Sequence, residues 1–160
     1  MIGYVKRLGK EITDKFQGKS PLVVCVLKGA SPFHSELIKH IDLMIEVDFL
    51  QVSSYVGTQS AGVITFKKDL ETDIKGRDVI IVEDIVDTGL TLSKLKEVLL
   101  YRSPSSLTFV SLLDKPSKRS VDFVPDMVGK TIDDLFVIGF GLDLDEKYRN
   151  LKDIYIYNQD

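Results

Sequence analysis

The stretch VIIVEDIVDTGLTLSKLKEVLLYR, residues 79–102, decides the fold of this 160-residue chain. Residues 79–85 form a nearly continuous apolar run, which is typical of a strand buried on both faces of a parallel sheet. Residues 92–102 are amphipathic, as expected of a helix that covers such a sheet. Because a strand that leads through a short turn into a helix is the building unit of α/β domains, this stretch predicts a mostly parallel, twisted sheet flanked by helices.

The flanking sequence continues this alternation of strands and helices. Apolar spacing and breaker residues predict helices at 4–16 and 32–40, and strands at 22–27, 43–53, 63–70 and 107–113. The last third is different, since it is rich in turns and charge and holds only two short apolar runs, 135–140 and 154–157. We therefore expect a single domain, residues 1–160, with a core at about 5–115 and a small C-terminal hood mainly at about 116–160.

Composition excludes several classes of protein. The net charge of −3 gives no overall basic surface for nucleic acid. No apolar run approaches the ~20 residues that a membrane helix needs, and the first residues lack the apolar segment of a signal peptide. The single cysteine, Cys25, can form no internal disulfide, which suits a reducing compartment. We expect a cytoplasmic protein that binds neither nucleic acid nor membrane, with His34 and His40 as surface residues of a helix.

The segment VEDIVDTGLT, residues 82–91, carries the chemistry. Two adjacent acids, Glu83 and Asp84, end the buried strand, and such a pair costs folding energy unless a cation or hydroxyl groups meet it. A turn with small residues then opens a helix, where free backbone N–H groups can bind a phosphate. An ordinary helix cap by Asp87 or Thr88 would explain the turn alone. The acids beside it favour a phosphorylated sugar, which presents both a phosphate and hydroxyls.

The same ten residues resemble the phosphoribosyl pyrophosphate-binding motif of type I phosphoribosyltransferases. The resemblance implies that Glu83 and Asp84 contact the ribose hydroxyls and that Asp87 acts as general acid/base near N7 of a purine. It also implies that a run of five residues cradles the 5-phosphate: Asp87, Thr88, Gly89, Leu90 and Thr91. Some members of the family carry lysine at the position of Leu90, so the resemblance does not extend to that one side-chain contact, and backbone donors can still hold the phosphate.

Four further segments extend the resemblance to the hypoxanthine (or hypoxanthine-guanine) phosphoribosyltransferases: LKGA at 27–30, SSYVGTQSAG at 53–62, LLDKPSKR at 112–119 and DDLFVIGFGLDLDEKYR at 133–149. Taken alone, each segment has an ordinary explanation as a turn, a hairpin loop, a surface lysine or a core aromatic. The resemblance implies pyrophosphate contacts from Lys28, Gly29 and Arg149, a flexible loop with Ser54 and Tyr55, purine contacts from Ile85, Lys115, Phe136, Val137 and Asp143, Mg²⁺ contacts from Glu83, Asp84 and Asp143, and a loop-stabilising Arg119.

The predicted function is therefore purine salvage. The resemblance implies Mg²⁺-dependent transfer of a 5-phosphoribosyl group from phosphoribosyl pyrophosphate to hypoxanthine or guanine, giving IMP or GMP and pyrophosphate, by a homodimer or homotetramer. Family members usually carry an N-terminal segment before the first helix, whereas this sequence begins almost at that helix. Two alternatives stay open: an RNA-binding regulator built on the same fold, and a transferase that prefers xanthine or orotate.

Overall fold

The computed structural model describes residues 1–54 and 63–158. Its main sheet has six strands in the order β3-β2-β1-β4-β5-β6, and a two-stranded sheet pairs β7 with β8. All pairs in the main sheet are parallel except β2 with β3. The elements are α1 (Ile2–Lys15), β1 (Leu22–Val26), α2 (Ser31–Leu37), η1 (Ile38–His40), β2 (Glu46–Ser54), β3 (Ile64–Lys68), β4 (Asp78–Val86), α3 (Leu90–Tyr101), β5 (Ser106–Asp114), η2 (Pro116–Lys118), β6 (Met127–Thr131), β7 (Val137–Ile138) and β8 (Tyr155–Ile156).

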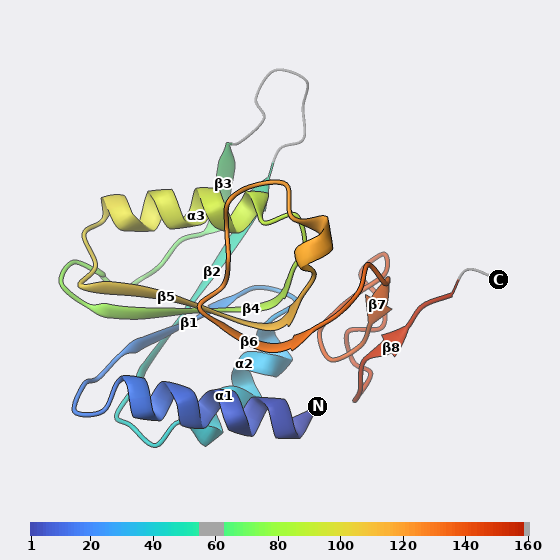
Figure 1. Cartoon of the computed structure of the whole chain (residues 1–160). Helices are drawn as coiled ribbons and strands as arrows, with labels where there is room; N and C mark the ends of the chain where they lie inside the picture. The colour runs from blue at the N-terminus through green and yellow to red at the C-terminus, as the bar shows by residue number, and fades with distance from the viewer. Residues whose placement is uncertain (55–62, 159–160) are drawn as a thin grey trace.

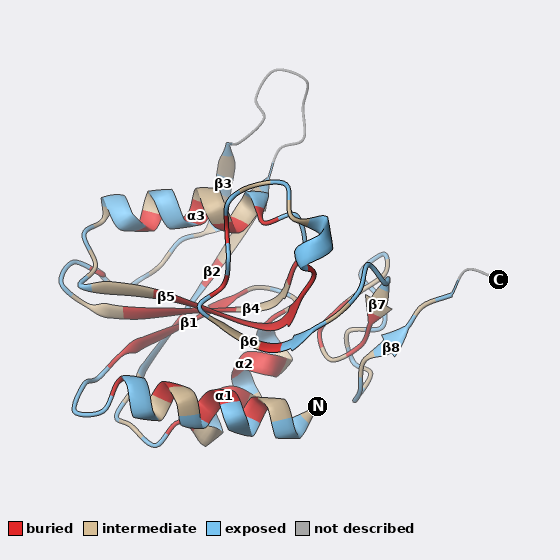
Figure 2. Ribbon diagram, viewed as in Figure 1, coloured by how far each residue is buried: buried red, intermediate tan, exposed pale blue. Residues whose placement is uncertain are grey.

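The sheet separates two apolar cores. Helices α1 and α2 cover one face of the sheet, and α3 covers the other (Figure 1). Side chains alternate between the two faces along each strand, so that Ile80 and Val82 pack towards α1 while Val79 and Ile81 pack towards α3. Figure 2 shows the consequence, with the buried residues concentrated along the strands and on the inner faces of the helices. The predicted α/β class with a mostly parallel sheet is confirmed.

One strand of the main sheet escaped the sequence analysis. Strand β6 pairs in parallel with β5, so the main sheet continues to Thr131, beyond the core boundary expected near residue 115. Its centre is Gly129, and a Cβ placed there would lie 2.5 Å from the carbonyl oxygen of Leu112. Only a glycine allows the two backbones to approach this closely. The same glycine weakens the strand pattern, because glycine in a short segment is more typical of a turn, and the strand was therefore not predicted.

The functional edge of the sheet follows from its topology. Strands β1, β4, β5 and β6 run in the same direction, so the segments that follow them lie at one edge. The chain beyond β6 leads into the small β7-β8 sheet, which stands at this same edge (Figure 1). In open α/β sheets ligands bind beyond the carboxyl ends of the strands, so this edge is where a site is expected.

The prediction for His34 was wrong. Its side chain is only 3% exposed, its Nε2 lies 3.4 Å from the carbonyl oxygen of Val23, and its ring meets Phe49 edge-on at 5.7 Å. Burial lowers the pKa of His34, so the neutral imidazole packs as part of the core. His40 is partly exposed and lies 3.2 Å from Glu36. Across the residues that the structure describes, no helix combines the length and the apolar character needed to span a membrane.

The close contact at Gly129 gives a test of the fold. We expect Gly129→Ala to lower the free energy of unfolding by about 1–3 kcal/mol, because the added Cβ forces β6 away from β5. Gly3→Ala is the matched control, since Gly3 lies in α1 with no atom within 4 Å of the added Cβ. Urea denaturation measures both variants. Equal stabilities for the two would show that β6 does not depend on this approach.

Candidate active site

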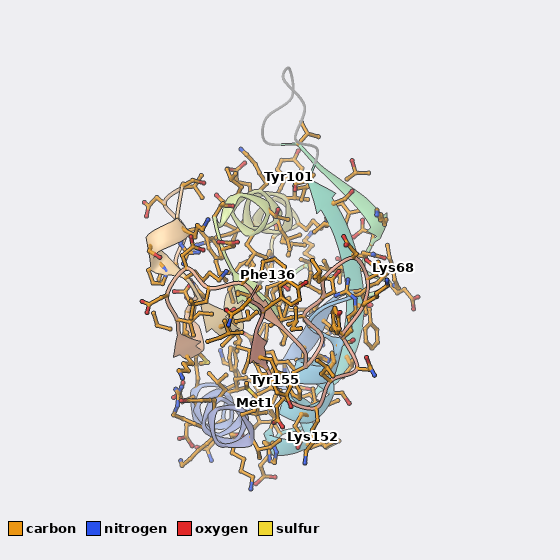
Figure 3. The ribbon with its side chains drawn as sticks, turned by 90° about the vertical axis from the view of Figure 1, so that its right-hand side faces the viewer. Met1, Lys68, Tyr101, Phe136, Lys152 and Tyr155 are labelled. Carbon is orange, nitrogen blue, oxygen red and sulfur yellow. The ribbon has the colours of Figure 1, made fainter. Side chains whose placement is uncertain are left out.

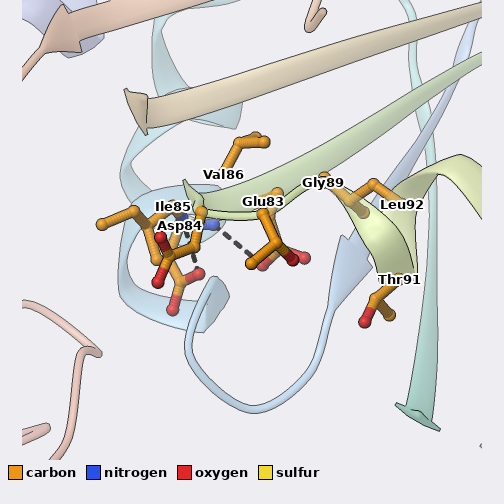
Figure 4. A pocket seen from close by; sticks show the side chains of 9 residues that line it. Glu83, Asp84, Ile85, Val86, Gly89, Thr91 and Leu92 are labelled. Carbon is orange, nitrogen blue, oxygen red and sulfur yellow. Dashed lines mark hydrogen bonds between the residues drawn. The ribbon is translucent and has the colours of Figure 1, made fainter. Parts of the chain in front are cut away.

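A cavity of about 210 Å³ opens where β4 ends and α3 begins. Figure 4 shows Glu83 and Asp84 on the strand side of this cavity, with Gly89 and Thr91 on the helix side. It is lined by Glu83, Asp84, Ile85, Val86, Asp87, Thr88, Gly89, Thr91 and Leu92. The structure therefore gathers most of the segment that the sequence singled out around one cavity with an acidic end and a hydroxyl-rich end.

The acidic end of the cavity is electrostatically unfavourable on its own. The backbone N–H of Asp84 donates to Glu83 Oε1 at 3.0 Å, and the N–H of Ile85 donates to Asp84 Oδ1 at 2.6 Å. Desolvation, followed by repulsion from Asp84, raises the pKa of Glu83 well above its ordinary value, and desolvation also raises the pKa of Asp84. Among the described residues, neither carboxylate has an ion-pair partner within 4 Å. The pair is suited to hydroxyl groups or a cation supplied by a ligand.

The negative charges of Glu83 and Asp84 also affect Cys25 in the neighbouring strand β1. Burial, and then the charges of Glu83 and Asp84, raise the pKa of Cys25 to about 12. A thiol with such a pKa stays protonated at neutral pH, and the side chain is completely buried. Cys25 is therefore a packing residue of the sheet, as its place in an apolar strand indicated.

The loop after β1 closes against this acidic end. The Leu27-Lys28 peptide is cis, and Gly29 follows it. A Cβ on Gly29 would overlap the carboxylate of Asp84, and a Cβ on Gly141 would overlap the carbonyl oxygen of Gly29. The loop after β1, the end of β4 and the hood therefore touch at these two glycines. A larger residue at Gly29 or Gly141 would push these segments apart.

The turn before α3 is braced from outside. Gly89 has a φ of +81° at the helix N-terminus, and Arg119 packs over it, with Cδ 3.0 Å from where a Cβ would lie. Arg119 also donates to the carbonyl oxygen of Asp87 at 3.3 Å and forms a largely buried ion pair with Asp114. The backbone N–H of Ser120 donates to the carbonyl oxygen of Thr88 at 3.0 Å. Arg119 was predicted to stabilise the loop region, and these contacts show what it holds.

Asp114 belongs to the site although it was not among the predicted residues. It is the last residue of β5, it is buried, and it pairs with Arg119. The available signal was an acid that ends an apolar strand, the same pattern that identified Glu83 and Asp84. Its partner comes five residues later, beyond the 3₁₀ turn η2, and sequence alone did not pair them.

Lys115 lies beside the end of β4. Its backbone N–H donates to the carbonyl oxygen of Val86 at 2.9 Å, and its side chain is only 8% exposed. Its Nζ lies 3.9 Å from Asp134, whose other carboxylate oxygen pairs with Lys118 at 2.9 Å. A nearly buried ammonium group with one long ion pair retains donor capacity for a ligand.

Phe136 precedes the two-stranded sheet of the hood. Seen from the hood side, it lies near the middle of the face, between α3 and α1 (Figure 3). Its side chain is 50% exposed, and its ring meets that of Tyr157 edge-on at 6.0 Å. The backbone N–H of Tyr157 donates to the carbonyl oxygen of Phe136 at 2.9 Å, which fixes the strand next to Val137. An aromatic ring held from one side and open on the other is suited to stacking.

A third cluster of charges lies in the hood. Arg149 pairs with Asp143 at 3.1 Å and with Glu146 at 3.1 Å, and it donates to the carbonyl oxygen of Gly141 at 2.8 Å. Glu146 also pairs with Lys28 at 2.9 Å. Hydrogen bonds from Lys28 and then Arg149 lower the pKa of Glu146, so it is ionised at neutral pH. Glu146 is a second residue that the sequence analysis missed, because a glutamate in an exposed turn carries no motif.

The predicted 5-phosphate run, residues 87–91, lines the cavity with one exception. Leu90 does not line it, and its side chain is 47% exposed at the first position of α3. Ser54 ends β2, whereas Tyr55 and the rest of the predicted flexible loop lie outside the described residues.

The acidic residues fit Mg²⁺ only in part. Across residues 1–54 and 63–158, no three acidic, histidine or cysteine side chains converge as a metal site. Glu83 and Asp84 supply two adjacent carboxylates, while both oxygens of Asp143 are already engaged, by Arg149 and by the N–H of Glu146. Mg²⁺ commonly binds through one or two carboxylates and completes its shell with water and substrate oxygens. The carboxylates at the end of β4 meet that requirement when a phosphorylated ligand provides the rest.

Comparisons with known proteins agree with this geometry. Residues 2–146 match the model of the phosphoribosyl transferase domain. The hypoxanthine-guanine phosphoribosyltransferase of Streptococcus thermophilus is 54% identical over 147 residues, which cover 91% of this chain and 82% of the relative. The crystal structure of a hypoxanthine-guanine phosphoribosyltransferase from Bacillus anthracis superimposes with a TM-score of 0.94 at 42% identity, covering 98% of this chain and 93% of that one.

A more distant structure carries a ligand. The hypoxanthine phosphoribosyltransferase of Trypanosoma cruzi, in complex with the product IMP, superimposes with a TM-score of 0.91 at 38% identity, over 97% of this chain and 88% of that one.

The paired carboxylates predict a conflict between stability and function. In metal-free buffer at neutral pH we expect Glu83→Gln to stabilise the protein by about 1 kcal/mol, which raises the melting temperature by roughly 2–4 °C for a domain of this size. A raised carboxyl pKa means that the folded state gains stability from protonation and loses it as pH rises through the folded pKa. The advantage of the variant must therefore shrink as pH falls towards the ordinary carboxyl pKa.

Calorimetry at several pH values measures this effect. Glu97→Gln is the control, because Glu97 is an exposed residue of α3 paired with Lys94 at 3.1 Å. A melting temperature for Glu83→Gln at or below that of the unchanged protein at neutral pH would show that the pair carries no electrostatic penalty.

Proposed function

This chain belongs to the phosphoribosyl transferase family and catalyses the hypoxanthine-guanine phosphoribosyltransferase reaction of purine salvage, and from that premise we propose how its residues divide the work. The observation that carries the proposal is the cavity at the end of β4, with two carboxylates at one end and a small-residue helix N-terminus at the other. In our proposal one domain performs the whole reaction, with the main sheet binding the sugar and the hood binding the base.

The sugar phosphate enters the cavity first. Glu83 and Asp84 accept hydrogen bonds from the ribose hydroxyls, which relieves their unfavourable burial. The 5-phosphate binds to the hydroxyls and backbone N–H groups of Thr88, Gly89 and Thr91 at the N-terminus of α3. Leu90 contributes its backbone alone, since it is exposed and does not line the cavity.

The pyrophosphate group lies towards the hood. Lys28 and Gly29 approach it from the loop after β1, and Arg149 approaches it from the hood. These residues hold the leaving group in line with the C1–N9 bond that forms, and positioning of this kind supplies a large share of the rate enhancement. Mg²⁺ would be held by Glu83 and Asp84, and near the pyrophosphate by Asp143, and when bound it neutralises the charge of the leaving group.

The purine stacks on Phe136 and faces Ile85, and the backbone of Val137 meets its edge. Lys115 donates to the exocyclic O6 of the base. An adenine in this place would leave that nearly buried donor unpaired, at a cost of roughly 1–3 kcal/mol, so the site selects 6-oxopurines. Asp87 lines the cavity and takes or gives the proton at N7 while N9 attacks the sugar.

We further propose that the protein assembles as a homodimer or homotetramer in the cytoplasm. Three large apolar side chains, Met44, Val47 and Phe49, are exposed along and just before β2. Val47 and Phe49 are two residues apart on one strand and therefore share a face, which a second copy of the chain would cover. The single buried cysteine is compatible with a reducing compartment.

A pyrophosphate-release assay tests the choice of base. With phosphoribosyl pyrophosphate and Mg²⁺ present, we expect hypoxanthine and guanine to be turned over, and adenine to react at least 10-fold less efficiently because Lys115 loses its acceptor. Xanthine and orotate, offered in direct competition, decide the alternatives. Preferred turnover of either one, or salt-sensitive RNA binding without any turnover, would replace the proposal.

Asp87 is tested by an isosteric change. We expect Asp87→Asn to lower kcat by 10-fold or more, within the ~10²–10⁴ range typical of general acid/base groups, while the KM for phosphoribosyl pyrophosphate changes little. The reason is that asparagine keeps the size and the backbone contact to Arg119 but cannot accept the N7 proton. Steady-state kinetics on both substrates provide the measurement, and an unchanged kcat would remove Asp87 from the proton transfer.

A further inference from the structure

The two cations assigned to pyrophosphate already share an internal anion. Glu146 Oε2 lies 2.9 Å from Lys28 Nζ, and Glu146 Oε1 lies 3.1 Å from Arg149 Nη2. One carboxylate therefore bridges the loop after β1 and the hood, across 118 residues of sequence. This is the arrangement that two oxygens of a phosphate group would adopt between the same lysine and arginine.

The backbone fixes Glu146 in this place. Leu144 and Lys147 exchange hydrogen bonds of 3.1 and 3.0 Å, which closes a two-residue turn formed by Asp145 and Glu146. The backbone N–H of Glu146 donates to Asp143 Oδ2 at 2.9 Å. The carboxylate is thus presented from a short, hydrogen-bonded turn and not from a long free loop.

The residue type at this position is unfavourable for the turn itself. Asp145 and Glu146 have φ values of +50° and +64°, a conformation that favours glycine or asparagine in such turns. A glutamate here costs conformational energy that a glycine would avoid. The side chain therefore contributes something that the turn does not need, and its only polar contacts among the described residues are Lys28 and Arg149.

We propose that Glu146 sets the affinity of the site for the pyrophosphate group by competing with it for Lys28 and Arg149. The inference rests on the proposed function, because it takes these two residues as the pyrophosphate ligands. When pyrophosphate binds, its oxygens replace the carboxylate. When it leaves, Glu146 returns, pairs again with both cations and keeps them oriented for the next substrate.

Exposure makes this exchange feasible. The side chains of Lys28 and Glu146 are 56% and 63% exposed, and ion pairs of this kind contribute little to stability. A weak, solvated pair can be displaced by a ligand that carries more charge, whereas a buried pair could not. Arg149 supports the same reading, because its Nε is buried without a hydrogen-bond partner among the described residues, so its contacts are incomplete without a ligand.

The test measures the affinity for inorganic pyrophosphate itself. Isothermal titration of the full chain with pyrophosphate and Mg²⁺ compares the unchanged protein with Glu146→Gln, which keeps the size of the side chain and removes its charge. We expect the Kd to fall about 5-fold, which corresponds to roughly 1 kcal/mol. The KM for phosphoribosyl pyrophosphate should fall with it, while the KM for hypoxanthine stays unchanged.

Glu97→Gln is the matched control, since it removes one exposed, ion-paired glutamate far from the site and changes net charge equally. A Kd that is unchanged or higher in Glu146→Gln, or a fall of equal size in Glu97→Gln, would overturn the inference.

Two more variants separate this inference from the proposed function. Lys28→Ala and Arg149→Ala should each weaken pyrophosphate binding in the otherwise unchanged protein. If both do so and Glu146→Gln does not tighten it, competition by Glu146 is wrong and the proposed ligands stand. If neither weakens it, the assignment of the pyrophosphate ligands is wrong, and the role of Glu146 is rejected with it.

Discussion

Two carboxylates placed side by side at the end of the central strand are the constraint on which the site depends. Glu83 and Asp84 are held by backbone hydrogen bonds between neighbours, and desolvation raises the pKa of both. A fold that presents such a pair accepts a local loss of stability. The loss is recovered when hydroxyl groups or a cation arrive, so the arrangement binds its ligand partly by relieving its own repulsion.

Three glycines allow the other segments of the site to approach this pair closely. Gly29 lies against the carboxylate of Asp84, Gly141 lies against the backbone of Gly29, and Gly89 leaves room for Arg119 over the phosphate turn. Each contact joins elements that are far apart in the sequence. A Cβ at Gly29 or Gly141 would overlap its neighbour and force the two segments apart. A displacement of about 1 Å is enough to disturb a site that works by positioning.

The sequence predicted the parts of the site that depend on local pattern. The buried strand of β4, the turn and the helix α3 follow from apolar periodicity, and the acids at the strand end could be recognised because they are unusual there. The sequence could not predict β6. Its central Gly129 is needed because the backbone of Leu112 lies so close, and this contact exists only in the folded sheet. Nor could it pair Asp114 with Arg119, or bury His34, since these follow from packing between elements.

Burial decides what each ion pair around the site can do. Asp114 and Arg119 are nearly inaccessible, so breaking their pair would leave a buried charge without a partner. The pair therefore stays closed and holds the phosphate turn in place. Glu146 and Lys28 are solvated, so their pair can open at little cost and can serve as a stand-in for a ligand. Lys115 lies between these cases, because its ammonium group is nearly buried while its partner Asp134 is half exposed and shared with Lys118. The same attraction between opposite charges therefore has three results that depend on burial. It fixes the phosphate turn through Arg119, leaves Lys115 able to donate to a base, and holds Lys28 and Arg149 in an ion pair that a ligand can displace.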